Sequence, residues 1–214
     1  MRRGNVLFKV TLSFLSVLML LLSLILACSR GDQPSEKKAA GPAINPYSNE
    51  SVFEEVQRKL KENPNDADAL YHLADLYERN AQYREAIGTY EKVLKLRPGS
   101  GYVYFKIGTA HSRLNQPLEA VTAFQSAIKY MPDYAVAYNN LGIAYGKLNK
   151  TDQEIAALKK AIKLRPRYSS ARYNLGMTYL RTGNKKEALK EYEALKDFDE
   201  GAAEALMKEI GKAP

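Results

Sequence analysis

The sequence predicts an all-α fold, a solenoid of stacked antiparallel helix pairs. One observation is a strict period, because four prolines lie 34 residues apart along the chain. These prolines are Pro64, Pro98, Pro132 and Pro166. The other observation is that apolar and small residues recur at fixed places between them, with the spacings of three and four that mark one face of a helix. One helix pair cannot bury its own apolar face, so we expect neighbouring pairs to stack.

The first segment of the chain indicates export to a membrane. A short basic stretch, "MRRGNVLFK", precedes an uncharged run over residues 10–27, and Cys28 follows directly. The ending "ILAC" resembles the lipobox of bacterial lipoproteins, which implies a signal peptide over 1–27 and a lipid on the Cys28 thiol. As a helix the uncharged run would span about 27 Å, nearly the hydrocarbon core of a bilayer. An uncleaved N-terminal membrane anchor is therefore the alternative.

A tether and a capping helix are expected before the repeats. Residues 28–49 contain three prolines and few apolar side chains, a composition typical of a flexible linker. Ser51 and Glu54, three residues apart, form a capping-box signature. We therefore predict an N-terminal capping helix over 50–64.

Each repeat contains two amphipathic segments. In the second repeat, Tyr104, Ile107 and Gly108 share one face of the first segment, and Ala120 and Phe124 share one face of the second. Small residues at the crossing let two helices approach closely, so each repeat is predicted to be an antiparallel helix pair. The four repeats are 67–100, 101–134, 135–168 and 169–202.

A C-terminal capping helix is predicted over 203–212. There Ala203, Leu206 and Ile210 fall on one stripe that can cover the last pair. The whole array is then expected to contain about ten helices.

This pattern resembles the tetratricopeptide repeat family over about Ala67 to Ala202. The segments that carry the resemblance are "AYNNLGIAY", "AIKLRP" and "EAIGTYEKVLKLRP". It implies a right-handed α-solenoid in which the first helices line a concave groove. Two residues depart from the pattern: Glu154 stands where a small residue is expected, and Glu200 replaces the closing proline of the fourth repeat. We expect Glu154 either to tilt its helix pair or to pair with a nearby lysine.

Composition argues against several classes of function. The net charge is +8, but Arg2, Arg3 and Lys9 lie in the targeting segment and the other basic residues are scattered, which argues against nucleic acid. The chain has one cysteine and two histidines, His72 and His111, too few for a cysteine-rich or multi-histidine metal site or a histidine-based triad. No phosphate-binding glycine loop is present. We therefore expect no catalytic residue, no cofactor and no metal.

The remaining candidate site is the face of the first helices opposite their packing stripe. Apolar and aromatic residues gather there, which favours partner binding over simple packing or burial against a second copy. The asparagine side chain can both donate to and accept from a peptide bond, which suits an extended ligand. The candidate partner-binding residues are Tyr71, Tyr102, Phe105, Lys106, Arg113, Asn139, Asn140, Ile143, Lys147, Tyr173, Asn174, Met177 and Arg181.

Two known ligand-binding patterns of this family match only in part or not at all. A similar asparagine ladder lines the repeats of the glycosyltransferase that modifies serine and threonine with N-acetylglucosamine, but His72 and Lys106 hold the corresponding places in the first two repeats here. The carboxylate clamp of chaperone-binding repeats is not matched by Tyr71 and Asp75.

The sequence therefore predicts a membrane-tethered adaptor that binds an extended segment or a helix of a partner protein and performs no chemistry. Resemblance to short repeat lipoproteins of bacterial envelopes implies a periplasm-facing protein that serves assembly of a pilus, secretin, outer-membrane or cell-wall machine. One alternative is a structural scaffold that forms homo-oligomers through the solenoid. Another is an uncleaved, single-pass inner-membrane repeat protein.

Overall fold

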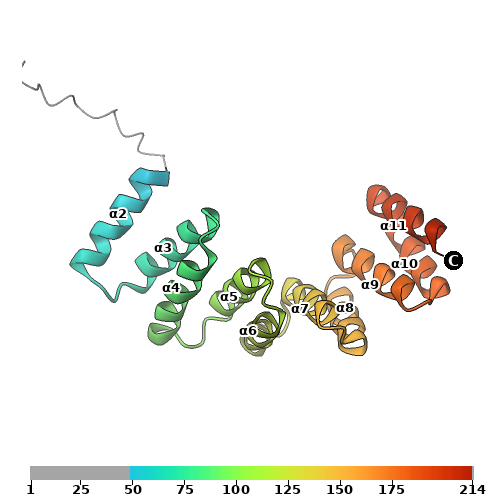
Figure 1. Ribbon diagram of the computed structural model, residues 1–214, viewed down its shortest axis with the longest axis horizontal. Helices are drawn as coiled ribbons and strands as arrows, with labels where there is room; N and C mark the ends of the chain where they lie inside the picture. Colours follow the sequence, from blue (N-terminus) through green and yellow to red (C-terminus); the bar gives the residue numbers. More distant parts are fainter. Residues whose placement is uncertain (1–48, 214) are drawn as a thin grey trace, which may run out of the picture. The chain divides into compact units, whose positions relative to one another are not determined.

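The computed structural model describes residues 49–213, and within this range the chain forms ten α-helices and no strand (Figure 1). The helices are α2 (Asn49–Glu62), α3 (Ala67–Arg79), α4 (Tyr83–Leu96), α5 (Gly101–Arg113), α6 (Pro117–Tyr130), α7 (Ala135–Lys147), α8 (Thr151–Leu164), α9 (Ser169–Arg181), α10 (Lys185–Lys196) and α11 (Glu200–Lys212). The expected targeting segment with Cys28, and the tether up to residue 48, lie outside the described residues. No helix in the described part has the length and apolar character needed to cross a bilayer.

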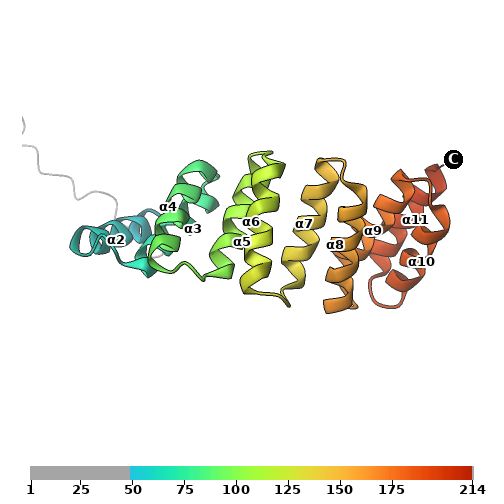
Figure 2. The same cartoon turned by 90° about the horizontal axis from the view of Figure 1, so that it is seen from below.

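The helices pack in chain order as antiparallel pairs. α3 packs with α4, α5 with α6, α7 with α8 and α9 with α10, and each second helix also contacts the first helix of the next pair. Figures 1 and 2 show this succession from two directions. The predicted all-α solenoid of antiparallel helix pairs is confirmed.

In two of the pairs, α5 with α6 and α7 with α8, a glycine of the first helix meets a large side chain of the second helix. A Cβ atom added at Gly108 would lie 2.7 Å from ring carbon Cδ1 of Phe124, and one at Gly142 would lie 2.8 Å from Cγ of Leu158. Both large side chains are almost completely buried, at 1% and 0% exposure. The absence of a side chain at these glycines therefore gives Phe124 and Leu158 the space in which they pack.

The turns inside the pairs repeat the same geometry. The residue after each first helix's C-cap has a positive φ, and these residues are again 34 positions apart. They are Ala81 (φ 58°), Asn115 (55°), Asn149 (56°) and Gly183 (77°). In the first turn the backbone N–H of Gln82 donates to the carbonyl of Tyr77 at 2.8 Å, the bond that closes a Schellman motif. All four first helices therefore end at the same place in the repeat.

The two outer helices cover the ends of the array. α2 packs against α3, with Val56 buried and the Phe53 ring edge-on to Tyr77 at a centroid distance of 6.0 Å. α11 packs against both α9 and α10 and buries Leu206 and Ile210. Leu206 also fills the space at the glycine of the last pair, since a Cβ at Gly176 would lie 2.6 Å from its Cδ2 atom.

Candidate partner-binding face

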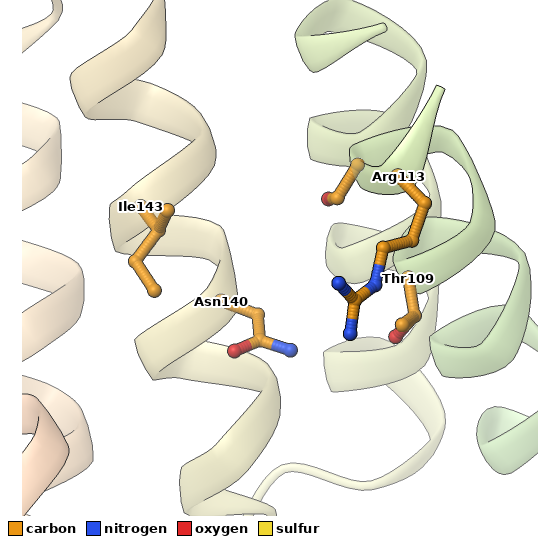
Figure 3. A pocket seen from close by; sticks show the side chains of 5 residues that line it. Thr109, Arg113, Asn140 and Ile143 are labelled. Carbon is orange, nitrogen blue, oxygen red and sulfur yellow. The ribbon is translucent and has the colours of Figure 1, made fainter. Parts of the chain in front are cut away.

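Two adjoining pockets lie along one side of α5, α7 and α9, which we call the first-helix face. The α5–α7 pocket has a volume of about 350 Å³ and is lined by Thr109, Ser112, Arg113, Asn140 and Ile143 (Figure 3). The α7–α9 pocket has a volume of about 370 Å³ and is lined by Ile143, Gly146, Lys147, Glu154, Asn174, Met177, Thr178 and Arg181. Ile143 belongs to both pockets and is 40% exposed. The two pockets therefore form one continuous candidate site.

Helical spacing places these side chains together. On α7, Asn140, Ile143 and Lys147 stand at positions i, i+3 and i+7, which share one face of a helix. Leu141 and Tyr145 of the same helix lie on the packing side and are buried. One side of α7 therefore packs in the core, and the other side lines the pockets.

A directional chain of amides fixes the asparagine side chains. The Nδ2 atom of Asn174 donates to Oδ1 of Asn139 at 3.0 Å, and Nδ2 of Asn139 donates to Oδ1 of Asn140 at 3.1 Å. Asn139 is only 4% exposed. The chain leaves the amide nitrogen of Asn140 on the side of Arg113 and Thr109 (Figure 3). The α5–α7 pocket consequently presents a hydrogen-bond donor at this point.

Glu154 pairs with an arginine, not with the lysine that we considered from the sequence. It is 8% exposed, its carboxylate accepts a hydrogen bond from the Thr178 hydroxyl at 2.6 Å, and it forms an ion pair with Arg181. The carboxylate lies where a side chain at position 146 would stand, since a Cβ added at Gly146 would lie 2.7 Å from its Oε1 atom. Gly146 thus provides the space that this acid needs at a helix crossing.

A basic residue ends each of the four first helices: Arg79, Arg113, Lys147 and Arg181. Positive charge is favourable at a helix C-terminus. Arg79 forms an ion pair with Asp75 at 2.8 Å, and Arg181 pairs with Glu154. Among residues 51–213, Arg113 and Lys147 form neither an ion pair nor a side-chain hydrogen bond.

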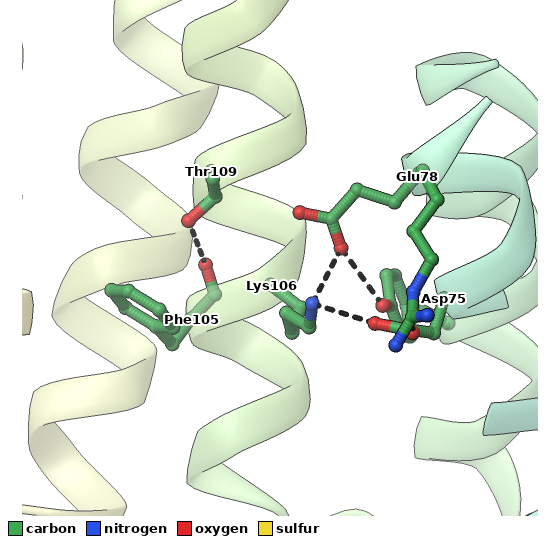
Figure 4. A network of polar contacts seen from close by, with 7 residues as sticks. Asp75, Glu78, Phe105, Lys106 and Thr109 are labelled. Carbon is green, nitrogen blue, oxygen red and sulfur yellow. Dashed lines mark hydrogen bonds and ion pairs between the residues drawn. The ribbon is translucent and has the colours of Figure 1, made fainter. Parts of the chain in front are cut away.

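Outside the two pockets, ion pairs join α3 to α5. The Lys106 ammonium lies 2.9 Å from Asp75 and 2.7 Å from Glu78, and the Tyr90 hydroxyl donates to Glu78 at 3.1 Å (Figure 4). Burial disfavours the charged form of Lys106, but hydrogen bonds and charge attraction from the two carboxylates outweigh it and raise the Lys106 pKa. Burial likewise opposes the charge of Asp75, yet Lys106 holds the Asp75 pKa below its usual value. Because Lys106 binds these two carboxylates of its own chain, its ammonium group is not available to a ligand.

Of the thirteen predicted site residues, seven line the two pockets. Those that line the two pockets are Arg113, Asn140, Ile143, Lys147, Asn174, Met177 and Arg181. Tyr71 and Tyr102 lie outside the pockets, on the helices α3 and α5 that the ion pairs join. Their ring centroids are 6.5 Å apart, and Tyr102 is 45% exposed. Tyr173 packs against the core cluster around Leu175.

Two predicted residues are buried and do not open onto the face. Phe105 is 9% exposed because its ring packs between Phe124 and Tyr134, at centroid distances of 5.8 and 5.0 Å. Asn139 is buried between α7 and α9, where its amide bonds to the side chains of Asn140 and Asn174. Their register on the first helices is that of open positions, but side chains of the neighbouring helices cover them.

Some pocket residues were not predicted as binding residues. Ser112 and Thr178 carry no distinguishing sequence signal. Gly146 has one, since it follows Gly142 by one helical turn and faces the acid at position 154. Within residues 49–213 no group of three or more histidine, cysteine, aspartate or glutamate side chains could hold a metal ion.

Family models of the tetratricopeptide repeat match the chain in three places, residues 67–100, 118–149 and 139–203. Together they cover more than half of the 214 residues. The chain belongs to the tetratricopeptide repeat family. No curated protein matches its sequence significantly.

Solved tetratricopeptide repeat structures share the fold. MamA is 26% identical with a TM-score of 0.66, and the match covers 77% of this chain and 91% of MamA. YrrB, described as a TPR protein with an unusual peptide-binding site, is 23% identical with a TM-score of 0.66 over 75% of this chain and 84% of its own. PilW, described as a widely conserved type IV pilus biogenesis factor, is 22% identical with a TM-score of 0.66 over 77% and 78%. At 22–23% identity, YrrB and PilW bear on the fold alone.

Replacing Lys106 by methionine should lower the free energy of unfolding at neutral pH by about 2 kcal/mol, because two half-buried carboxylates would lose their cation. Since the Asp75 pKa is depressed, the pair stabilises the fold above the usual value of about 4 and loses that contribution as the pH falls through the lowered pKa. Urea unfolding of both proteins should therefore show a difference that shrinks below about pH 4.

The matched control is Arg58→Met, which removes an ion pair to Glu62 whose side chains are both 68% exposed. We expect it to cost about 0.5 kcal/mol or less. Equal losses for the two variants, or a Lys106→Met loss that persists unchanged in acid, would contradict the role given to Lys106.

Proposed function

We propose that this tetratricopeptide repeat array is an adaptor that holds a segment of a partner protein on the first-helix face of α5, α7 and α9. The observation that carries the proposal is the pair of adjoining pockets that share the exposed Ile143. Because the pockets follow one another along the array, a single stretch of chain can occupy both.

The chemistry of the pockets suits a polypeptide. Ile143 and Met177 offer apolar surface, which contributes about 25 cal/mol for each Å² removed from water. Asn140 and Asn174 hold amide groups of fixed orientation beside that surface, which can pair with the N–H and C=O groups of a peptide backbone. A mixture of apolar anchors and a few positioned polar groups is typical of a recognition site.

The membrane tether is part of the proposal. The uncharged run over 10–27, the "ILAC" ending and the proline-containing stretch over 28–49 support a lipoprotein that carries its repeats a short distance from a bacterial envelope membrane. A role in assembling a pilus, secretin, outer-membrane or cell-wall machine follows from the same resemblance. We infer no catalytic activity for the repeat array, in keeping with a family of protein-interaction folds.

A photo-cross-linking residue, p-benzoylphenylalanine, in place of Ile143 should form an adduct with a distinct protein in living cells. The same residue in place of Leu118, which is 61% exposed on α6, should not form it, because that position lies outside the pockets. Mass spectrometry of the adducts is the measurement. The same adduct from both positions, or none from position 143, would count against the adaptor. Adducts between copies of this chain alone would favour the oligomeric scaffold.

Replacing Cys28 by alanine should abolish labelling by a fatty-acid analogue, because the thiol is the proposed site of lipid attachment. Ser29→Ala is the matched control, and it should keep the label. Unchanged labelling in Cys28→Ala would refute the lipoprotein. An intact mass that still includes residues 1–27 would identify the uncleaved anchor instead.

A further inference from the structure

We infer that the first-helix face selects an acidic segment of its partner, with one side-chain carboxylate bound at Arg113 and a second at Lys147. This inference rests on the proposed function and specifies the chemistry of the ligand. It starts from the charges of the three helices that form the face.

The helices α5, α7 and α9 contain no aspartate or glutamate. Their sequences are "GYVYFKIGTAHSR", "AVAYNNLGIAYGK" and "SSARYNLGMTYLR". Among the described residues, the only acid that lines either pocket is Glu154 of α8, and its charge is balanced by Arg181. Within this part of the chain the face is therefore positive, and a ligand of opposite charge complements it.

Two of the cations are available to a ligand. Lys106 is held by Asp75 and Glu78, and Arg172 is held by Glu191 at 2.7 Å. Arg113 and Lys147 have no such partner within the described part of the chain, and each lines one of the two pockets. Both side chains are exposed, so they can approach a carboxylate without a loss of existing contacts.

The α5–α7 pocket presents donors to an anion. The amide nitrogen of Asn140 and the Arg113 side chain come from facing helices, and in Figure 3 the Arg113 guanidinium lies between Asn140 and Thr109. The amide chain through Asn139 engages the side-chain oxygen of Asn140, and no group in residues 51–213 accepts a hydrogen bond from its nitrogen. Arginine can bind a carboxylate through two parallel hydrogen bonds, and the amide of Asn140 adds a third donor. This arrangement fits an acceptor-only group.

The spacing of the cations favours two acidic side chains over one chain terminus. Arg113 and Lys147 occupy equivalent places on α5 and α7, which are in contact. Packed helices have axes about 8–10 Å apart, and an extended chain rises about 3.3 Å per residue. Two carboxylates two to four residues apart can therefore reach both cations, and at a spacing of four the apolar side chain midway between them points to the same side and reaches Ile143.

The test uses the full-length chain in detergent and ten-residue fluorescent peptides, acetylated and amidated so that they carry no terminal carboxylate. In one set two glutamates stand two, three or four positions apart around a leucine, and in the matched set both are glutamine. Fluorescence anisotropy at low ionic strength should show that at least one glutamate peptide binds about tenfold or more tightly than its glutamine counterpart. Added salt should reduce that preference, because it screens exposed charge pairs.

Arg113→Gln and Lys147→Gln should each reduce the preference several-fold, and the double variant should remove it. Arg84→Gln on α4 and Lys163→Gln on α8 remove the same charge from exposed positions that line neither pocket, and they should leave the preference unchanged. Circular dichroism should show the same helix content in all of these variants.

Equal binding of the glutamate and glutamine sets would overturn this inference and leave the adaptor standing, provided that Ile143→Glu abolishes the binding. Binding of neither set would also overturn it. A neutral peptide with a free C-terminal carboxylate that binds as tightly as the best glutamate peptide would show that the face reads a chain terminus instead. Loss of the cross-link from position 143 remains the separate test of the adaptor itself.

Discussion

The close approach of two helices at a glycine is the contact on which the rest of this structure depends. At Gly108 and Gly142 the first helix of a pair has no side chain, and a buried phenylalanine or leucine of the second helix fills that space. The same arrangement closes the array, where Gly176 meets Leu206 of α11. Because one side of α5, α7 and α9 is used in this way, the opposite side of these three helices is left to form the first-helix face.

The cations of that face differ in whether they have an acidic partner in the array. Within the described residues, acids of α3 bind Lys106 of α5, and Glu154 of α8 binds Arg181 of α9, so the charges of these two cations are balanced inside the array. Arg113 and Lys147 lie between these two networks and are not satisfied. The stretch of the face with open pockets is thus also the stretch with unbalanced charge.

The period of 34 residues was enough to predict the helix pairs, because every repeat places its apolar residues in the same register. Most pocket residues could also be predicted from that register, as Asn140, Ile143 and Asn174 show. The burial of Phe105 could not be predicted from the register, since it depends on contacts with Phe124 and Tyr134. The partners of Lys106 and Glu154 lie about 30 residues away and depend on how successive pairs stack. One repeat read by itself carries no information about such contacts.

The most direct test of the glycine contact compares alanine at Gly108 with alanine at Gly88 in chemical unfolding followed by circular dichroism. Both glycines are inside helices, where alanine is favoured by about 0.5–1 kcal/mol. A Cβ at Gly88 meets no atom within 4 Å, so Gly88→Ala should raise the free energy of unfolding by about that amount. Gly108→Ala should lower it by about 1 kcal/mol, because the new carbon overlaps the buried Phe124 ring. An increase for both variants would contradict the account.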